Sequence, residues 1–161
     1  MYHSNKSTAL WIATLISVLL TVLILFFIFF NSAQDGSASS QYSRLFTQWI
    51  NQRLEILPFP LHFHEHFIRK LAHFTEFALL GLSVMLTLRT VFAARSFSLP
   101  LLFCFGVAGL DELSQFFSAG RTPKLTDVCI DLCGSITGVL IGTMLLWIAK
   151  KMRYVLNRKR N

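Results

Sequence analysis

The sequence predicts an all-α integral membrane protein, a bundle of four transmembrane helices with one amphipathic helix lying in the membrane interface. Of its 161 residues, 53% are hydrophobic and 14% are charged, whereas a soluble domain usually carries about 25% charged residues. Four apolar stretches are each near the ~20 residues that a helix needs to cross a bilayer. One polar connection carries apolar residues at helical spacing. The length suits a single membrane domain over residues 1–161.

The four apolar stretches give the expected transmembrane helices at about 9–30, 67–92, 97–117 and 126–148. The first is uninterrupted over 22 residues. The apolar region of a signal peptide covers only about 7–15 residues, so we expect this helix to remain in the protein.

Residues 42–56 predict the interfacial helix. Its apolar positions at helical spacing are Leu45, Phe46, Trp49, Ile50 and Leu54. Polar residues lie between them, and such a helix lies in the interface with its tryptophan at headgroup depth. Pro58 and Pro60 follow and cannot continue a helix.

The distribution of basic residues predicts that both termini are cytoplasmic. Four spans place the two ends on one side, where nine of the fifteen Lys and Arg residues would lie. Six of those nine are in the tail at 149–161. Basic residues are enriched in short cytoplasmic segments of membrane proteins. A basic cluster beside a transmembrane helix therefore indicates the cytoplasmic face rather than a nucleic-acid site.

Ionisable and polar residues inside the last three spans are the candidate site. They are Arg69, Lys70, His73, Glu76, Asp111, Glu112, Gln115, Asp127 and Asp131. Under the predicted topology these positions all lie at the outer ends of their spans, with Arg121 in the adjoining loop. Charged residues inside a membrane are costly and usually functional. Glycines at 134, 138 and 142 would let the fourth span approach a neighbour closely and bring its aspartates into the bundle.

The charge balance of this cluster predicts an outward-facing polar pocket. Three cationic residues face five carboxylates, so a proton or a further cation is needed even if His73 is charged. Arg69, Lys70 and Arg121 are the candidates for binding an anionic group such as a lipid phosphate. His73, Glu76 and Asp111 are the candidates for acid–base catalysis. Glu112, Gln115, Asp127 and Asp131 complete the predicted ligand-binding set.

Other chemistries are weakly indicated. The alternating histidines of residues 62–66 could bind a metal ion on a strand, but no supporting pattern accompanies them, and we predict no metal site and no cofactor. The three cysteines lie inside apolar runs and are expected to be small buried thiols. No nucleotide-binding or serine-nucleophile motif is present, and nothing indicates that Ser114 is activated.

Three separated motifs resemble VanZ-like membrane proteins. They are Arg69-Lys70-x-Ala72-His73-Phe74-x-Glu76, Asp111-Glu112-x-x-Gln115-Phe116, and Asp127-Val128-x-Ile130-Asp131-x-x-Gly134. Gly120-Arg121 and Ser32-x-Gln34 are also similar to the family pattern. Phe77 stands where a tyrosine is common and Ser114 where a histidine is common, and both changes remove a candidate for proton transfer.

The resemblance implies a bacterial cell-membrane protein, and the founding type is associated with resistance to the glycopeptide teicoplanin. Two functional hypotheses follow, and a third is structural. In the first hypothesis, the protein binds membrane lipids or a lipid-linked envelope precursor. In the second, it is an enzyme that acts on such a lipid by acid–base chemistry. In the structural alternative, the charged residues form an ion-pair network that fixes the helix register without a ligand.

Overall fold

The computed structural model describes residues 2–56, 58, 61–92 and 96–158. The basic residues Arg95, Lys159 and Arg160 lie outside this range. The described residues form five helices, α1 (Tyr2–Ser32), α2 (Gly36–Leu54), α3 (Glu65–Phe92), α4 (Ser98–Phe116) and α5 (Leu125–Arg158). All except α2 are long and apolar enough to cross a membrane. The predicted all-α membrane fold with four spanning helices is confirmed.

Several helices extend beyond the predicted ranges: α1 begins at Tyr2 rather than 9, and α2 and α5 are extended for local reasons. α2 begins at Gly36 rather than 42, because the chain before it is anchored: the N–H of Gly36 donates to the carbonyl of Ala119 at 2.9 Å. α5 continues through the basic tail to Arg158. Lys and Arg have high helix propensity, so the helix does not need the membrane to continue.

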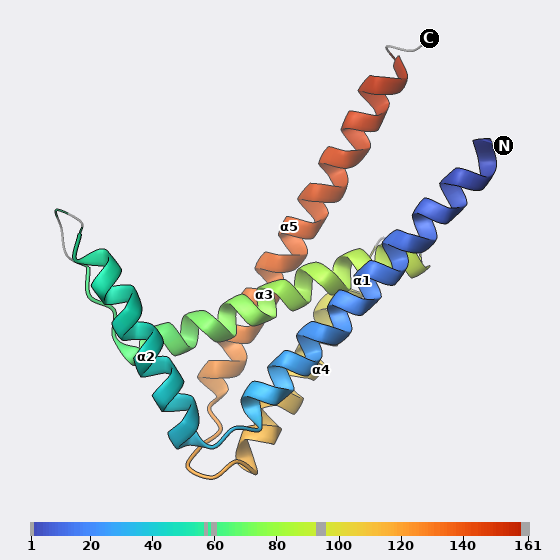
Figure 1. Ribbon diagram of the computed structural model, residues 1–161. Helices are drawn as coiled ribbons and strands as arrows, with labels where there is room; N and C mark the ends of the chain where they lie inside the picture. The colour runs from blue at the N-terminus through green and yellow to red at the C-terminus, as the bar shows by residue number, and fades with distance from the viewer. Residues whose placement is uncertain (1, 57, 59–60, 93–95, 159–161) are drawn as a thin grey trace.

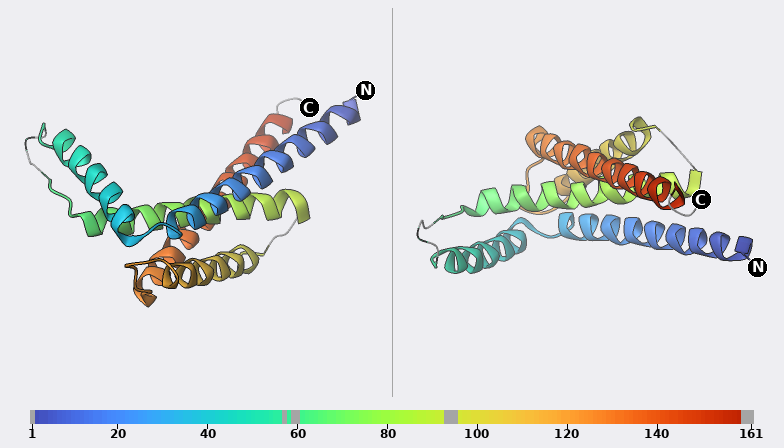
Figure 2. Two further views of the ribbon diagram at one scale, coloured as in Figure 1. Left: turned by 60° about the horizontal axis from the view of Figure 1, so that its bottom comes forward. Right: turned by 90° about the horizontal axis from the view of Figure 1, so that it is seen from above.

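The helix α3 is the centre of the molecule (Figure 1), and it packs against each of the other four helices. Figure 2 shows α1 on one side of α3 and α5 on the other. The beginning of α1 and the end of α5 lie at the same end of the bundle (Figure 1). This arrangement agrees with an even number of membrane crossings.

The contact between α3 and α5 is made backbone against backbone through glycines. A Cβ atom added at Gly134 or Gly138 would overlap the carbonyl of Phe74 or Ala78, respectively. One added at Gly81 would overlap the carbonyl of Ser135. Such small-residue contacts are how transmembrane helices approach most closely. The predicted role of the glycines at 134 and 138 is therefore seen, and Gly81 of α3 completes the contact.

Side chains rather than glycines fill the contact between α3 and the helices α1 and α4. Its fully buried members include Ile28, Phe77, Leu80, Cys104 and Ala108. The prediction of three buried thiols holds for Cys104 and is wrong for Cys129 and Cys133, which are exposed on α5. The glycine-bearing face of α5 is the one that packs against α3, which leaves the face of these two cysteines exposed.

Candidate functional site

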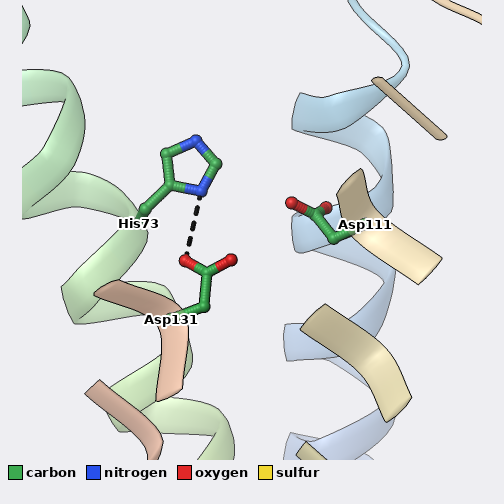
Figure 3. Close-up of side chains that lie close together, drawn as sticks. All are labelled: His73, Asp111 and Asp131. Atoms are coloured by element: carbon green, nitrogen blue, oxygen red, sulfur yellow. Dashed lines mark ion pairs between the residues drawn. The ribbon is translucent and has the colours of Figure 1, made fainter. Parts of the chain in front are cut away.

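Three of the predicted residues meet inside the bundle from three different helices. The metal-ligand type atoms of His73 (α3), Asp111 (α4) and Asp131 (α5) all lie within 4.8 Å of one another. In Figure 3 the carboxylate of Asp131 lies beside the ring of His73, and the carboxylate of Asp111 points toward both from the other side. Both aspartates are 0% exposed. The glycine contact of α5 with α3 places Asp131 beside His73, since Asp131 is one turn before Gly134.

The two buried aspartates have different surroundings. Asp111 accepts a hydrogen bond from the hydroxyl of Ser32 at the end of α1, and another from Nε2 of Gln115 at 3.0 Å. Neither oxygen of Asp131 has a hydrogen-bond partner. Nδ1 of His73 lies 3.5 Å from Oδ1 of Asp131. This distance is too long for a good hydrogen bond.

The two glutamates of the predicted site lie around this centre. Glu76 accepts a hydrogen bond from Nδ2 of Asn31 at 2.9 Å. Glu112 accepts one from the backbone N–H of Lys124, just before α5, and its second oxygen has no partner. Glu112 thus connects the end of α4 to the start of α5.

The cationic residues do not form ion pairs with Asp111 or Asp131 in the described part of the chain. Nη2 of Arg69 binds Glu65 at 2.8 Å and Oγ of Ser40 at 2.9 Å. Nη2 of Arg121 donates to the carbonyl of Asn31 at 3.1 Å. Burial lowers the pKa of Arg121, and the nearby charge of Arg69 lowers it further. The two arginines therefore lie near each other without a shared carboxylate, an arrangement that an added anion would stabilise.

A cavity of about 500 Å³, which we call the polar chamber, opens beside the centre. Its polar lining residues include Asn31, Ser32, Arg69, His73, Glu76 and Arg121. Ser39, Tyr42 and Ser43 of α2 form a further wall. The interfacial helix thus covers the site from one side.

A second cavity, of about 530 Å³ and almost wholly apolar, adjoins the polar chamber between α1, α2 and α3. We call it the apolar groove. Its lining includes Leu20, Leu23, Ile24, Phe27 and Leu79. Five residues line both cavities: Phe27, Phe46, Ile68, Ala72 and Glu76. The chamber and the groove therefore adjoin each other along these five residues.

The remaining predicted residues lie at the edge of the site. Lys70 and Asp127 line a small polar pocket together with Lys124 and His66. His62, His64 and His66 are exposed, and Glu65 begins α3 instead of belonging to a strand. Arg69, expected to face the carboxylates of the spans, pairs with Glu65.

Sequence reasoning missed four contributors to the site: Asn31, Ser32, Ser40 and Glu65. The first three belong to a polar stretch, residues 31–40, that looks like a connecting turn and lies far from α3 in sequence. The signal that could have identified Ser32 was its place in the motif shared with the VanZ pattern.

Comparisons with known proteins identify the family of the chain. No curated protein and no solved structure matches the chain. The model of the family described as VanZ/LLP1 matches residues 17–147, which is most of the chain and includes every residue of the centre and of the polar chamber. The chain therefore belongs to the VanZ/LLP1 family.

Proposed function

We propose that this membrane protein binds an anionic lipid or a lipid-linked envelope precursor, with the headgroup in the polar chamber and the hydrocarbon chain in the apolar groove. The observation that carries the proposal is that the two cavities adjoin each other and share five lining residues. A lipid likewise has a polar headgroup followed by an apolar chain. Ligand sites in proteins are mostly apolar and carry a few placed polar groups.

The arginines supply the attraction for the headgroup. Arg69 and Arg121 line the chamber from α3 and from the loop before α5. Guanidinium groups bind phosphate and carboxylate with two parallel hydrogen bonds. Because neither arginine pairs with the buried aspartates, each has donors to offer to a ligand that enters from the side of α2.

Native mass spectrometry of the purified full-length protein tests this proposal through the lipids that it retains. Hydrogen bonds to a charged group contribute about 1.5–3 kcal/mol, so Arg121→Gln should reduce retained anionic lipid roughly tenfold or more. Arg44→Gln is the matched control, because Arg44 is exposed on α2 and lines neither cavity. Equal retention by wild type and Arg121→Gln would overturn the role of the arginines.

A second variant tests whether the ligand extends from one cavity into the other, without changing a charged residue. Ala72 is exposed and lines both of them. Ala72→Phe should therefore fill the junction and expel the lipid while the protein stays folded. Ala13→Phe, at an exposed position of α1, should retain lipid as the wild type does. If Ala72→Phe keeps its lipid, the ligand does not extend through the junction.

Binding of this kind gives a route to teicoplanin resistance. A protein that holds a lipid-linked envelope precursor on the outer face of a bacterial cell membrane changes how a glycopeptide reaches its target. Expression of the wild type should then raise the teicoplanin concentration needed to stop growth, and Arg121→Gln should not. Reporter fusions at both ends should give cytoplasmic signals, as the basic residues predict.

Acid–base catalysis on the bound lipid is the second candidate, favoured by His73 and Glu76 both lining the polar chamber. In an enzyme, His73→Asn and Glu76→Gln should abolish turnover of the lipid while protein and lipid retention persist. If the charged residues are only a structural network, the same variants should instead lose folded protein.

A further inference from the structure

We propose that His73, Asp111 and Asp131 form a binding site for one divalent transition-metal ion. One imidazole nitrogen and two carboxylates are ligands that Zn²⁺, Mn²⁺ and Fe²⁺ accept. The site is distinct from lipid binding by the arginines and does not depend on it. It also revises the prediction from sequence, which considered a metal only at the histidines of residues 62–66.

The spacing of the three side chains suits a shared ion. Metal bonds to nitrogen and oxygen are about 2.0–2.2 Å long, so two ligands of one ion lie roughly 3–4.4 Å apart, depending on the angle between them. The atoms of His73, Asp111 and Asp131 lie within 4.8 Å of one another. Small side-chain adjustments would therefore bring all three into range, with no movement of the helices.

Asp131 provides an independent indication of a missing cation. It is fully buried, and neither of its oxygens has a hydrogen-bond partner. Figure 3 shows its carboxylate directed into the space between His73 and Asp111. A buried carboxylate that accepts no hydrogen bond is strongly destabilising. A coordinated ion would satisfy both aspartates at once.

The charges around the centre also leave room for a cation. A protonated His73 and Arg121 carry two positive charges near three carboxylates, those of Asp111, Asp131 and Glu76. Arg69 and Arg121 donate to Glu65, to Ser40 and to the carbonyl of Asn31, rather than to the aspartates. A divalent ion bound to a neutral His73 would balance the two aspartates.

The surroundings of Asp111 are those of a supported metal ligand. The Ser32 hydroxyl and the Gln115 amide donate to its two oxygens and fix the orientation of the carboxylate. Ligating carboxylates are typically held by hydrogen bonds of this kind. His73 also lines the polar chamber, so an ion has a path of entry and open positions for water or for an anionic group.

Metal analysis of the purified full-length protein tests the site. After chelation and reloading with Zn²⁺ or Mn²⁺, the wild type should hold about one ion per chain by elemental mass spectrometry. Asp131→Asn, which keeps the shape of the side chain, should lower the affinity at least tenfold. His64→Asn is the matched control and should leave it unchanged. The proposal is overturned if the wild type takes up no ion, or if Asp131→Asn binds the ion as tightly as the wild type does.

Two further measurements keep the test valid if Asp131→Asn does not fold. Wild type loaded with Co²⁺ should show visible absorption bands of a site with nitrogen and oxygen ligands, and these bands should disappear on adding excess Zn²⁺. Zn²⁺ should also raise the unfolding temperature of wild type and His64→Asn equally. An ion that is lost in His64→Asn and kept in Asp111→Asn would place the metal at the histidines before α3 and refute the buried site.

Discussion

The two sides of α3 are packed in opposite ways. Toward α5, glycines bring backbone against backbone at Gly81, Gly134 and Gly138. Toward α1 and α4, large side chains such as Phe77 and Leu80 fill the contact. Beyond these side chains the contact opens into the apolar groove between α1, α2 and α3. One helix thus combines a closed, rigid face with a face that leaves space for a ligand.

This difference explains how a polar centre can lie inside a membrane protein and still be reached. The glycine contact fixes Asp131 against His73, because helices that approach this closely have little freedom to shift. The α1 side supplies Asn31 and Ser32, which hold Glu76 and Asp111, and it borders the polar chamber. The closed face positions the buried charges, and the open face gives access to them.

The largest effect should come from removing a side chain on the α1 and α4 side. Phe77 is 0% exposed, so Phe77→Ala leaves a cavity. The free energy of unfolding should fall by about 3 kcal/mol, which is the lower end of the range for such substitutions in soluble cores. The transfer contribution is small here, because lipid is as apolar as the core. Thermal unfolding in detergent measures the loss. Phe105→Ala, at a position 54% exposed on α4, is the matched control and should change stability little. A similar loss in both would mean that the contact is not packed as described.

On the α5 side, enlarging a residue should be the harmful change. Gly138→Ala places a methyl group against the carbonyl of Ala78 and should cost about 1–3 kcal/mol. Gly106→Ala is the matched control, because a Cβ at Gly106 meets nothing within 4 Å. That variant should be neutral or slightly stabilising, since alanine is favoured over glycine in a helix by about 1 kcal/mol. If both variants behave alike in the same unfolding measurement, the close contact of α3 and α5 is not what holds them together.

The contrast between the two sides of α3 also explains which features could be predicted from the sequence. Apolar length and glycine spacing depend on local chemistry, so four spans and the close approach of α5 follow from them. It could be predicted that His73, Asp111 and Asp131 lie at a similar depth, because the alternating directions of the spans place the corresponding helix ends on one side of the membrane.

The individual pairings could not be predicted, because they depend on which face of each helix packs. Arg69 binds Glu65 and Ser40 instead of a carboxylate of the spans. Glu76 takes its hydrogen bond from Asn31, which is 45 residues away. Asn31, Ser32 and Ser40 look like turn residues, and only the tertiary arrangement brings their polar groups to the site.

The smallest effect concerns hydrogen bonds between hydroxyl groups on the α1 side. Thr21 and Thr87 join α1 to α3 at 3.0 Å between their hydroxyl oxygens. Such bonds contribute only about 0.6 kcal/mol on average in membrane proteins, because the separated helices find other partners. A double-mutant cycle of Thr21→Val and Thr87→Val should give a coupling of this size in unfolding experiments. Thr21→Val combined with Thr137→Val should be additive, because the Thr137 hydroxyl bonds only to the Cys133 carbonyl of its own helix. Coupling of equal size in both cycles would show that the hydrogen bond between Thr21 and Thr87 does not specifically hold α1 to α3.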